Sequence, residues 1–335
     1  MVVLGFLFTL LTTSWSVMGV RKILGSKQKL SQYPFLVPLT VSAEDKPNAV
    51  PNTPPFSSKT LQALFSVAAV SGFIATRTSL VLANPANSLF MLTATLASFV
   101  FGARFPPKLK KIVHPLVTCT GLTWLASILM AASTGNSFLG MLKLYKTGSL
   151  TPLWSTGAGD VLLFMLGPAV VALSCQMYDR KKLMRENLKE VGTAVVTSTV
   201  GGLFGTALMV RSFGIASASL RLSLLSRNIT SPLAMAIATI LNADVSLAVS
   251  IVVISGLIGA NFGAFILDTA NIEDPVARGL GIGAASHGLG TAAFSNEPDA
   301  FPFAAISMAL TASLSTILVT IPAVRDLLTK IALGL

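Results

Sequence analysis

The sequence predicts an all-α polytopic membrane protein with about 9 to 11 transmembrane helices. Of the 335 residues, 53% are hydrophobic and only 11% are charged, whereas a soluble domain carries about 25% charged residues. The mean hydropathy of +0.75 points the same way. The apolar residues also gather in runs that approach the ~20 residues a helix needs to cross a bilayer. These observations exclude a soluble globular protein.

The first element is an apolar run from Val2 to Val20, which is followed by Arg21 and Lys22. A signal peptide carries basic residues before its apolar core and small residues at a cleavage site. The sequence has neither feature, so residues 1–22 are expected to form a true span. Residues 23–58 are polar and rich in proline, which is typical of a linker. The remaining block of spans covers residues 59–335.

This block contains long apolar runs at roughly 59–75, 86–103, 112–133, 160–178, 188–210, 245–267, 276–296 and 300–321. Two shorter runs, 213–226 and 230–241, fall below spanning length and are expected to be half-helices or one interrupted element. The order of lengths predicts two inverted five-helix repeats with two broken helices.

Basic residues cluster in the connections before the second, fourth and sixth spans: Lys22, Lys27, Lys29, Lys46 and Lys59; Arg104, Lys108, Lys110 and Lys111; Arg180, Lys181, Lys182 and Arg185. These connections fall on one side of the membrane, which the positive-inside rule assigns to the cytosol or its organelle equivalent. The net charge of +11 therefore reflects orientation in a lipid bilayer. We expect no nucleic-acid partner, because no aromatic-laced soluble basic surface is present.

The run from Arg278 to Ala293 is too apolar for a surface loop, yet its five glycines make it a poor continuous helix. A broken span fits this pattern. Hydrocarbon offers no partners to the backbone groups that a break releases, so protein, water or a ligand must satisfy them. Ser286 and His287 lie at the break, with Gly288 and Gly290 after them. The alternative is a glycine-packed helix in which the histidine bonds a neighbouring carbonyl.

A second break is expected at Gly167 and Pro168, because proline removes a helical hydrogen bond and kinks the chain. The same span opens with Asp160. This residue has two readings that the sequence leaves open: an N-terminal helix cap, or an intramembrane acid that binds a proton or cation. We expect the two broken spans to approach each other near the bilayer midplane.

The segment from Ser226 to Pro232 places a cation and several hydrogen-bond donors at the start of a helix. A helix N-terminus attracts anions, and Arg227 could add a bidentate clamp on a carboxylate. The alternative is an interfacial arginine with a Ser/Thr helix cap.

No catalytic or metal-binding pattern is present in the sequence. Cys119 and Cys175 lie in apolar runs, and His114 stands beside Pro115 at a span entrance. The acidic residues around Arg278 and Glu297 are interpreted as solvated turns. We expect no enzyme activity, no cofactor and no metal.

Several motifs together resemble the LrgB family over about residues 59–335: Gly157–Asp160, Leu166–Leu173, Arg227–Pro232, Gly256–Phe262, Asp274–Gly279 and Ser286–Ala292. Some members are plastidal and join an LrgA-like half to an LrgB-like half. Residues 1–22 resemble the last transmembrane helix of such an LrgA-like half, and 23–58 the linker after it. Because this sequence lacks the rest of such a half and a transit peptide, the resemblance leads us to expect a truncated gene product or a fragment.

The resemblance implies a transporter of small hydroxy-monocarboxylates, glycolate and glycerate, in the plastid (chloroplast) inner envelope. It also implies a homo-oligomer or an LrgA-like partner. Bacterial members imply the alternative, a holin- or antiholin-like plasma-membrane protein that modulates murein hydrolase export or cell lysis. In the transporter reading, the substrate site is Arg227, Asn228, Thr230, Ser231, Ser286, His287, Gly288 and Thr291. His287 carries the proton, because its ordinary pKa of about 6.5 lies near working pH, and Asp160 is the competing proton site.

Overall fold

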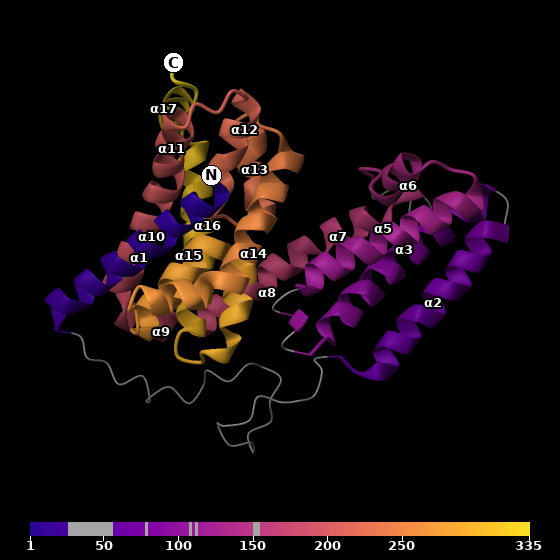
Figure 1. Ribbon diagram of the computed structural model, residues 1–335, viewed down its shortest axis with the longest axis horizontal. Coiled ribbons are helices and arrows are strands. Elements are labelled where there is room, and N and C mark those ends of the chain that lie inside the picture. The colour runs from indigo at the N-terminus through magenta and orange to yellow at the C-terminus, as the bar shows by residue number, and fades with distance from the viewer. Residues whose placement is uncertain (26–55, 78–79, 107–108, 111–112, 150–154) are drawn as a thin grey trace. The chain divides into compact units, whose positions relative to one another are not determined.

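The computed structural model describes residues 1–25, 56–77, 80–106, 109–110, 113–149 and 155–335, and these are almost entirely helical (Figure 1). Most of the predicted linker lies outside the described residues. The chain forms two compact units. Unit 1 comprises Met1–Asp45 and Leu173–Leu335, and unit 2 comprises Lys46–Ala172.

Seven of the described helices are long and apolar enough to cross a membrane. They are α1 (Val2–Leu24), α2 (Ser58–Arg77), most of α3 (Leu80–Ala103), α5 (Pro115–Thr134), the stretch Leu188–Ser212, α14 (Val245–Thr269) and α16 (Phe301–Thr320). Ala158–Pro168 and Ser231–Ile240 are shorter apolar helices. The predicted all-α polytopic membrane protein is confirmed, while the inverted five-helix repeats stay a prediction.

Unit 2 is built from α2, α3, α5, α6 (Phe138–Tyr145), α7 (Ala158–Phe164) and the first part of α8 (Leu166–Asp179). Its long helices approach closely where glycine leaves room: a Cβ at Gly72 would meet the Phe90 ring at 2.9 Å. His114 caps α5, since its Nδ1 accepts a hydrogen bond from the Leu116 N–H at 3.3 Å. His114 is therefore structural.

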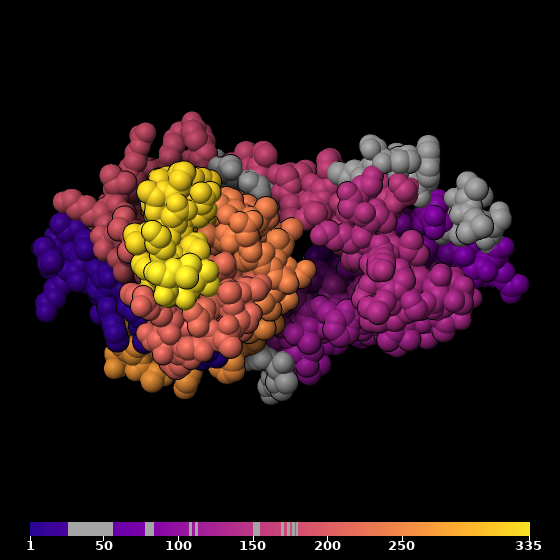
Figure 2. Space-filling view, turned by 90° about the horizontal axis from the view of Figure 1, so that it is seen from above, coloured from indigo at the N-terminus to yellow at the C-terminus, as the bar shows by residue number. Residues whose placement is uncertain are grey.

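Unit 1 surrounds helix α15 (Pro275–Ala293), which packs against α1, α14 and α16 (Figure 1). Around this centre lie α9 (Lys181–Glu186), α10 (Leu188–Val200), a π-helical turn (Gly201–Gly205), α11 (Thr206–Ser212), α12 (Ala218–Ser223), a 3₁₀ turn (Leu224–Ser226), α13 (Ser231–Ile240) and a second 3₁₀ turn (Phe294–Asn296). The C-terminal helix α17 (Pro322–Leu333) lies on the surface beside α11 and α12, and its atoms are yellow in Figure 2.

Glycines allow the close packing of α15. A Cβ at Gly279 or Gly283 would collide with the carbonyl oxygens of Ala300 and Ala304, and one at Gly281 would collide with the Ser14 hydroxyl of α1. The glycines that weaken the helix in isolation therefore let two neighbouring helices, α1 and α16, approach its backbone.

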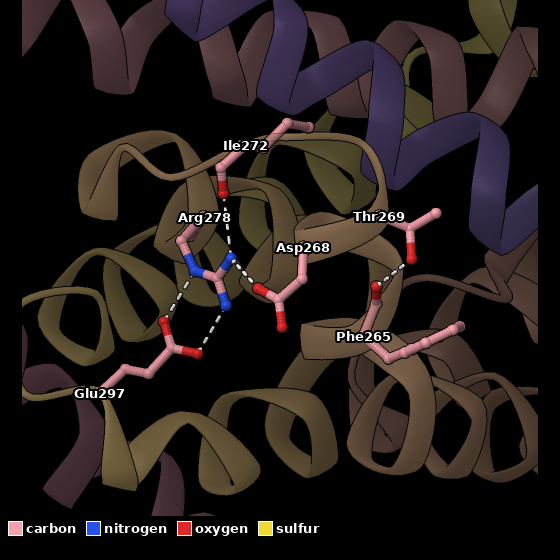
Figure 3. Close-up of polar contacts among 6 residues, drawn as sticks. All are labelled: Phe265, Asp268, Thr269, Ile272, Arg278 and Glu297. Atoms are coloured by element: carbon pink, nitrogen blue, oxygen red, sulfur yellow. Dashed lines mark hydrogen bonds and ion pairs between the residues drawn. The ribbon is translucent and has the colours of Figure 1, made fainter.

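Two arginines fasten the N-terminal end of α15, where the sequence suggested solvated turns. The Arg278 guanidinium donates to both Glu297 carboxylate oxygens at 2.7–2.8 Å, to Asp268 at 2.7 Å and to the Ile272 carbonyl at 2.9 Å (Figure 3). Arg21 of α1 pairs with Asp274 at 2.9 Å. The solvated-turn interpretation is wrong for Arg278, because a nearly buried cation requires paired acceptors.

Helix α1 is an integral part of unit 1. Phe6, Leu10 and Val17 are fully buried in its core, and Ser14 donates to the Ala277 carbonyl of α15 at 3.2 Å. The compact units thus divide the chain differently from the domains expected from sequence. The origin of residues 1–22 in an LrgA-like half and the extent of a transport domain over 59–335 stay predictions.

Candidate functional site

Helix α15 breaks at His287, whose backbone φ of 44° and ψ of −140° are not helical. A positive φ is uncommon for a residue with a side chain. The break leaves carbonyls at the end of the first half-helix without helical partners, and side chains from other elements reach them. Asn228 donates to the Ala284 carbonyl at 3.2 Å, and Ser255 donates to the Ala285 carbonyl at 3.5 Å.

The His287 ring is buried against α14. Its Nε2 lies 2.8 Å from the Val252 carbonyl oxygen, and because a carbonyl only accepts, Nε2 must carry the hydrogen. The ring reaches this carbonyl because Gly256 has no side chain: a Cβ there would lie 2.5 Å from His287 Cε1. The bond fixes the ring's tautomer in the neutral state and leaves Nδ1 as its acceptor.

Arg227 lies in the non-helical stretch between the 3₁₀ turn at Leu224–Ser226 and α13, and its side chain is only 1% exposed. Its Nε donates to the Thr206 hydroxyl at 3.0 Å and its Nη2 to the Thr9 hydroxyl at 2.8 Å. Its Nη1 has no partner in the described part of the chain. Gly5 of α1 permits this approach, since a Cβ there would collide with the guanidinium.

The electrostatic situation of Arg227 is unusual for a buried cation. Its described neighbours hold it through neutral hydroxyls, and the ion pairs within the described residues involve other arginines. A buried charge without an opposite charge is costly unless a ligand supplies one. The position therefore favours an anion.

Asn228 connects the Arg227 segment to the break in α15. Its amide nitrogen bonds the Ala284 carbonyl, while its Oδ1 is buried and has no partner among the residues described. The side chain lies against Gly202, where a Cβ would come within 2.7 Å of Asn228 Nδ2. Gly202 belongs to the π-helical turn, a feature often found at functional sites.

The other predicted residues of this region have structural partners or stand at helix starts. Thr230 is the N-cap residue of α13, and Ser231 begins that helix. The Ser286 hydroxyl donates to the Ile282 carbonyl at 2.7 Å, and the Thr291 hydroxyl lies 3.5 Å from the Ala304 carbonyl. Gly288 opens the second half of α15 and is exposed, whereas Gly290 is packed against Ser286.

Asp160 lies in unit 2 and is held by four hydrogen bonds. It accepts from the Thr147 N–H and hydroxyl at 2.8 Å, and from the Gly148 and Gly157 N–H groups at 3.0 Å. Gly157 is the N-cap residue of α7 and Asp160 stands at the third helical position, where its carboxylate accepts from the Gly157 N–H. Asp160 thus helps to cap the helix without being its N-cap residue, and a proton-coupling role stays a prediction. Gly167 and Pro168 lie in the first turn of α8, just after an interruption at Met165. The approach of this break to the one at His287 also stays a prediction.

Sequence reasoning missed Thr9 and Thr206, which bond the Arg227 guanidinium, and Gly5, which leaves room for it. Gly5 and Thr9 belong to α1, which was interpreted as a separate span. The available signal was the pair Thr9 and Thr13, two polar residues one turn apart in an apolar helix, because such pairs mark a face that meets protein instead of lipid.

Fold and site together define an integral membrane protein of the polytopic α-helical class, with a buried arginine that has no ion-pair partner among the described residues and lies next to Asn228, which bonds the broken helix. The model of the LrgB-like family matches residues 95–324, and the chain belongs to this family. The resemblance drawn from the motifs is thereby confirmed.

Three relatives illustrate the range of the family. Plastidal glycolate/glycerate translocator 1, chloroplastic, of Arabidopsis thaliana is 33% identical over 96% of this chain, which spans 60% of that protein. Holin-like protein CidB of Staphylococcus aureus (strain N315) is 25% identical over 70% of this chain and 95% of its own length. Uncharacterized protein YxaC of Bacillus subtilis is 32% identical over 45% of this chain and 66% of its own. No solved structure matches.

Proposed function

We propose that this protein is a membrane transporter of small hydroxy-monocarboxylates such as glycolate and glycerate. The observation that carries the proposal is Arg227, a fully buried guanidinium with one nitrogen unpartnered among the described residues. A monocarboxylate is the smallest organic ligand that supplies the missing negative charge and accepts the remaining N–H. The similarity to a protein named as a glycolate/glycerate translocator supports the same substrate class.

In this proposal, the carboxylate binds Arg227 together with N–H groups at the starts of α13, near Thr230, and of the second half of α15, near Gly288. Both helix starts contribute partial positive charge. Asn228 Oδ1 is a buried acceptor without a partner in the described structure, and it accepts a hydrogen bond from the 2-hydroxyl group of the substrate. Ser286 and Thr291 already bond carbonyls, so they would join only by exchanging those bonds.

Arg227 is closed off from water, so an anion reaches it only when the elements around it move apart. We infer alternating access in which one bundle moves against another, by analogy with other carriers that contain broken helices. His287 lies at the moving break and would carry the proton of a coupled cycle. We propose that the protein lies in the plastid inner envelope; the relative's name, which says plastidal and chloroplastic, supports the plastid. We further propose that it assembles as a homo-oligomer or with an LrgA-like protein.

Purified protein in proteoliposomes tests the proposal. Protein-dependent, saturable uptake of labelled glycolate or glycerate is the expected result, and competition by unlabelled substrate should reduce it. Empty liposomes and liposomes with an unrelated membrane protein serve as controls. If the purified protein takes up neither glycolate nor glycerate above the level of the controls, the proposed transport function is contradicted.

The alternative is a holin- or antiholin-like protein that modulates murein hydrolase export or lysis. The similarity to the holin-like CidB proteins favours it. In the same vesicles, a pore would release a trapped fluorescent dye and would show no saturation with glycolate. A buried arginine with an unpaired nitrogen favours the transporter, since a scaffold gains nothing from that cost.

A further inference from the structure

Two fully buried threonines have no hydrogen-bond partner in the described structure: Thr13 of α1, the helix that holds Arg227 through Thr9, and Thr199 of α10, which packs against α1. A threonine or serine in a membrane helix usually donates to a carbonyl of its own preceding turn. The neighbours of Thr13 do so, since Ser16 donates to the Thr12 carbonyl at 2.6 Å and Thr12 to the Phe8 carbonyl. The hydroxyls of Thr13 and Thr199 make no such bond to their own helix.

Both threonines stand within one helical turn of a contact of the Arg227 site. Thr13 is one helical turn from Thr9, which bonds Arg227, and residues four apart lie on one face, ~5–6 Å between their Cβ atoms. Thr199 lies near the end of α10, three residues before Gly202 of the π-helical turn, against which Asn228 packs, so it stands within one turn of that contact. Helices α1 and α10 pack against each other. The two hydroxyls therefore belong to the same buried region as the unpartnered Arg227 Nη1 and Asn228 Oδ1.

Another hydroxyl of α10 shows that pairing is possible in these helices. Ser198 and Thr311 of α16 are both buried, and their hydroxyl oxygens lie 2.8 Å apart. A helix interface that needs only structural satisfaction resolves its hydroxyls in this way. Thr13 and Thr199 have no such partner in the described structure. One of their hydroxyls can therefore donate a hydrogen bond to a ligand hydroxyl while the other accepts one from it.

We propose that Thr13 and Thr199 bind a second hydroxyl group of the substrate, the 3-hydroxyl that glycerate has and glycolate lacks. The proposal rests on the transport function proposed above and adds its selectivity. Arg227 and Asn228 recognise the carboxylate and the 2-hydroxyl that both acids share. The two threonines set the preference for a dihydroxy acid over a monohydroxy acid.

The test compares the half-saturation concentrations of glycerate and glycolate in proteoliposomes. Thr13→Val and Thr199→Val replace the hydroxyl by a methyl group of similar size. Each should raise the value for glycerate about tenfold more than the value for glycolate, whereas Thr13→Ser should restore the wild-type ratio. Thr12→Val is the matched control, because the Thr12 hydroxyl bonds its own helix, and its ratio should equal that of wild type.

The ratio separates recognition from folding, since a damaged or scarce protein changes uptake of both acids equally. An unchanged ratio in both valine variants, with wild-type protein transporting both acids, would overturn the selectivity role and leave the transport function standing. A wild-type protein that takes up neither acid would overturn the transport function and this inference with it.

Discussion

Arg227 is the proposed binding residue for the substrate carboxylate, and its replacement gives the first prediction. Arg227→Gln keeps a polar side chain but removes the charge, so the carboxylate loses its counter-ion. We expect the half-saturation concentration for glycolate to rise at least tenfold, which corresponds to ~1.4 kcal/mol of lost binding. Titration of labelled glycolate uptake in proteoliposomes measures this effect.

The matched control for Arg227 is Arg325, which lies on the surface and pairs with its neighbour Asp326. Arg325→Gln should leave the half-saturation concentration at the wild-type value. Equal values for wild type, Arg325→Gln and Arg227→Gln would show that the buried guanidinium does not bind the substrate.

His287 and Asp160 are the two candidates for the proton carrier of the proposed transport cycle. His287→Gln keeps a hydrogen-bond donor for the Val252 carbonyl but does not titrate, so the pH dependence of transport should flatten. Equilibrium binding of the acid anion should change less. Uptake rates and binding measured over a series of pH values separate the two quantities.

The corresponding variant in unit 2, Asp160→Asn, should behave differently. It replaces an acceptor oxygen by an amide NH2 group that faces N–H and hydroxyl donors, so it should lower stability by roughly 1–3 kcal/mol and keep the pH profile. If His287→Gln keeps the wild-type profile and Asp160→Asn flattens it, the proton belongs to Asp160.

At the scale of elements, the glycines of α15 serve packing as well as the break. Gly283→Ala would place a methyl group against the backbone of Ala304, so unfolding should become easier by roughly 1–3 kcal/mol. Gly192→Ala in α10 is the control, because nothing lies within 4 Å of its Cβ position. It should stabilise the helix, by up to ~1 kcal/mol. Thermal unfolding in detergent compares the two, and an equal response would contradict the packing role.

Local sequence could predict the helices of this fold but not most of their partners. A bilayer forces the backbone into helices, so composition and run length were sufficient for the class. The break at His287 was also foreseeable, because a glycine-rich apolar run is a poor helix. Arg227 bonds Thr9, which lies 218 positions away in the sequence. Arg278 pairs with Asp268 before it and with Glu297 after it. Such pairs depend on the tertiary arrangement, which local patterns do not encode.

At the scale of the whole molecule, helix α1 links the N-terminal end of the chain to the proposed transport site. It provides Thr9 to Arg227, Ser14 to α15 and Arg21 to Asp274. Sequence reasoning treated α1 as the remnant of a different half, because only the tertiary contacts place it beside α10 and α15. If these contacts hold α1 in place, the covalent connection to the rest of the chain is unnecessary for its position.

This leads to the last prediction. A protease site introduced between residues 26 and 55 should allow cleavage after folding, and the fragment that contains α1 should then remain bound to the rest in detergent. Gly281→Leu should release the fragment, because a side chain at Gly281 would collide with Ser14. Gly19→Leu, on α1 itself, should not release it, since nothing lies within 4 Å of that position. Co-purification after cleavage measures the outcome. If the fragment separates from wild-type protein, α1 is held by the chain connection alone, and its contacts with Arg227 are too weak to form part of the site.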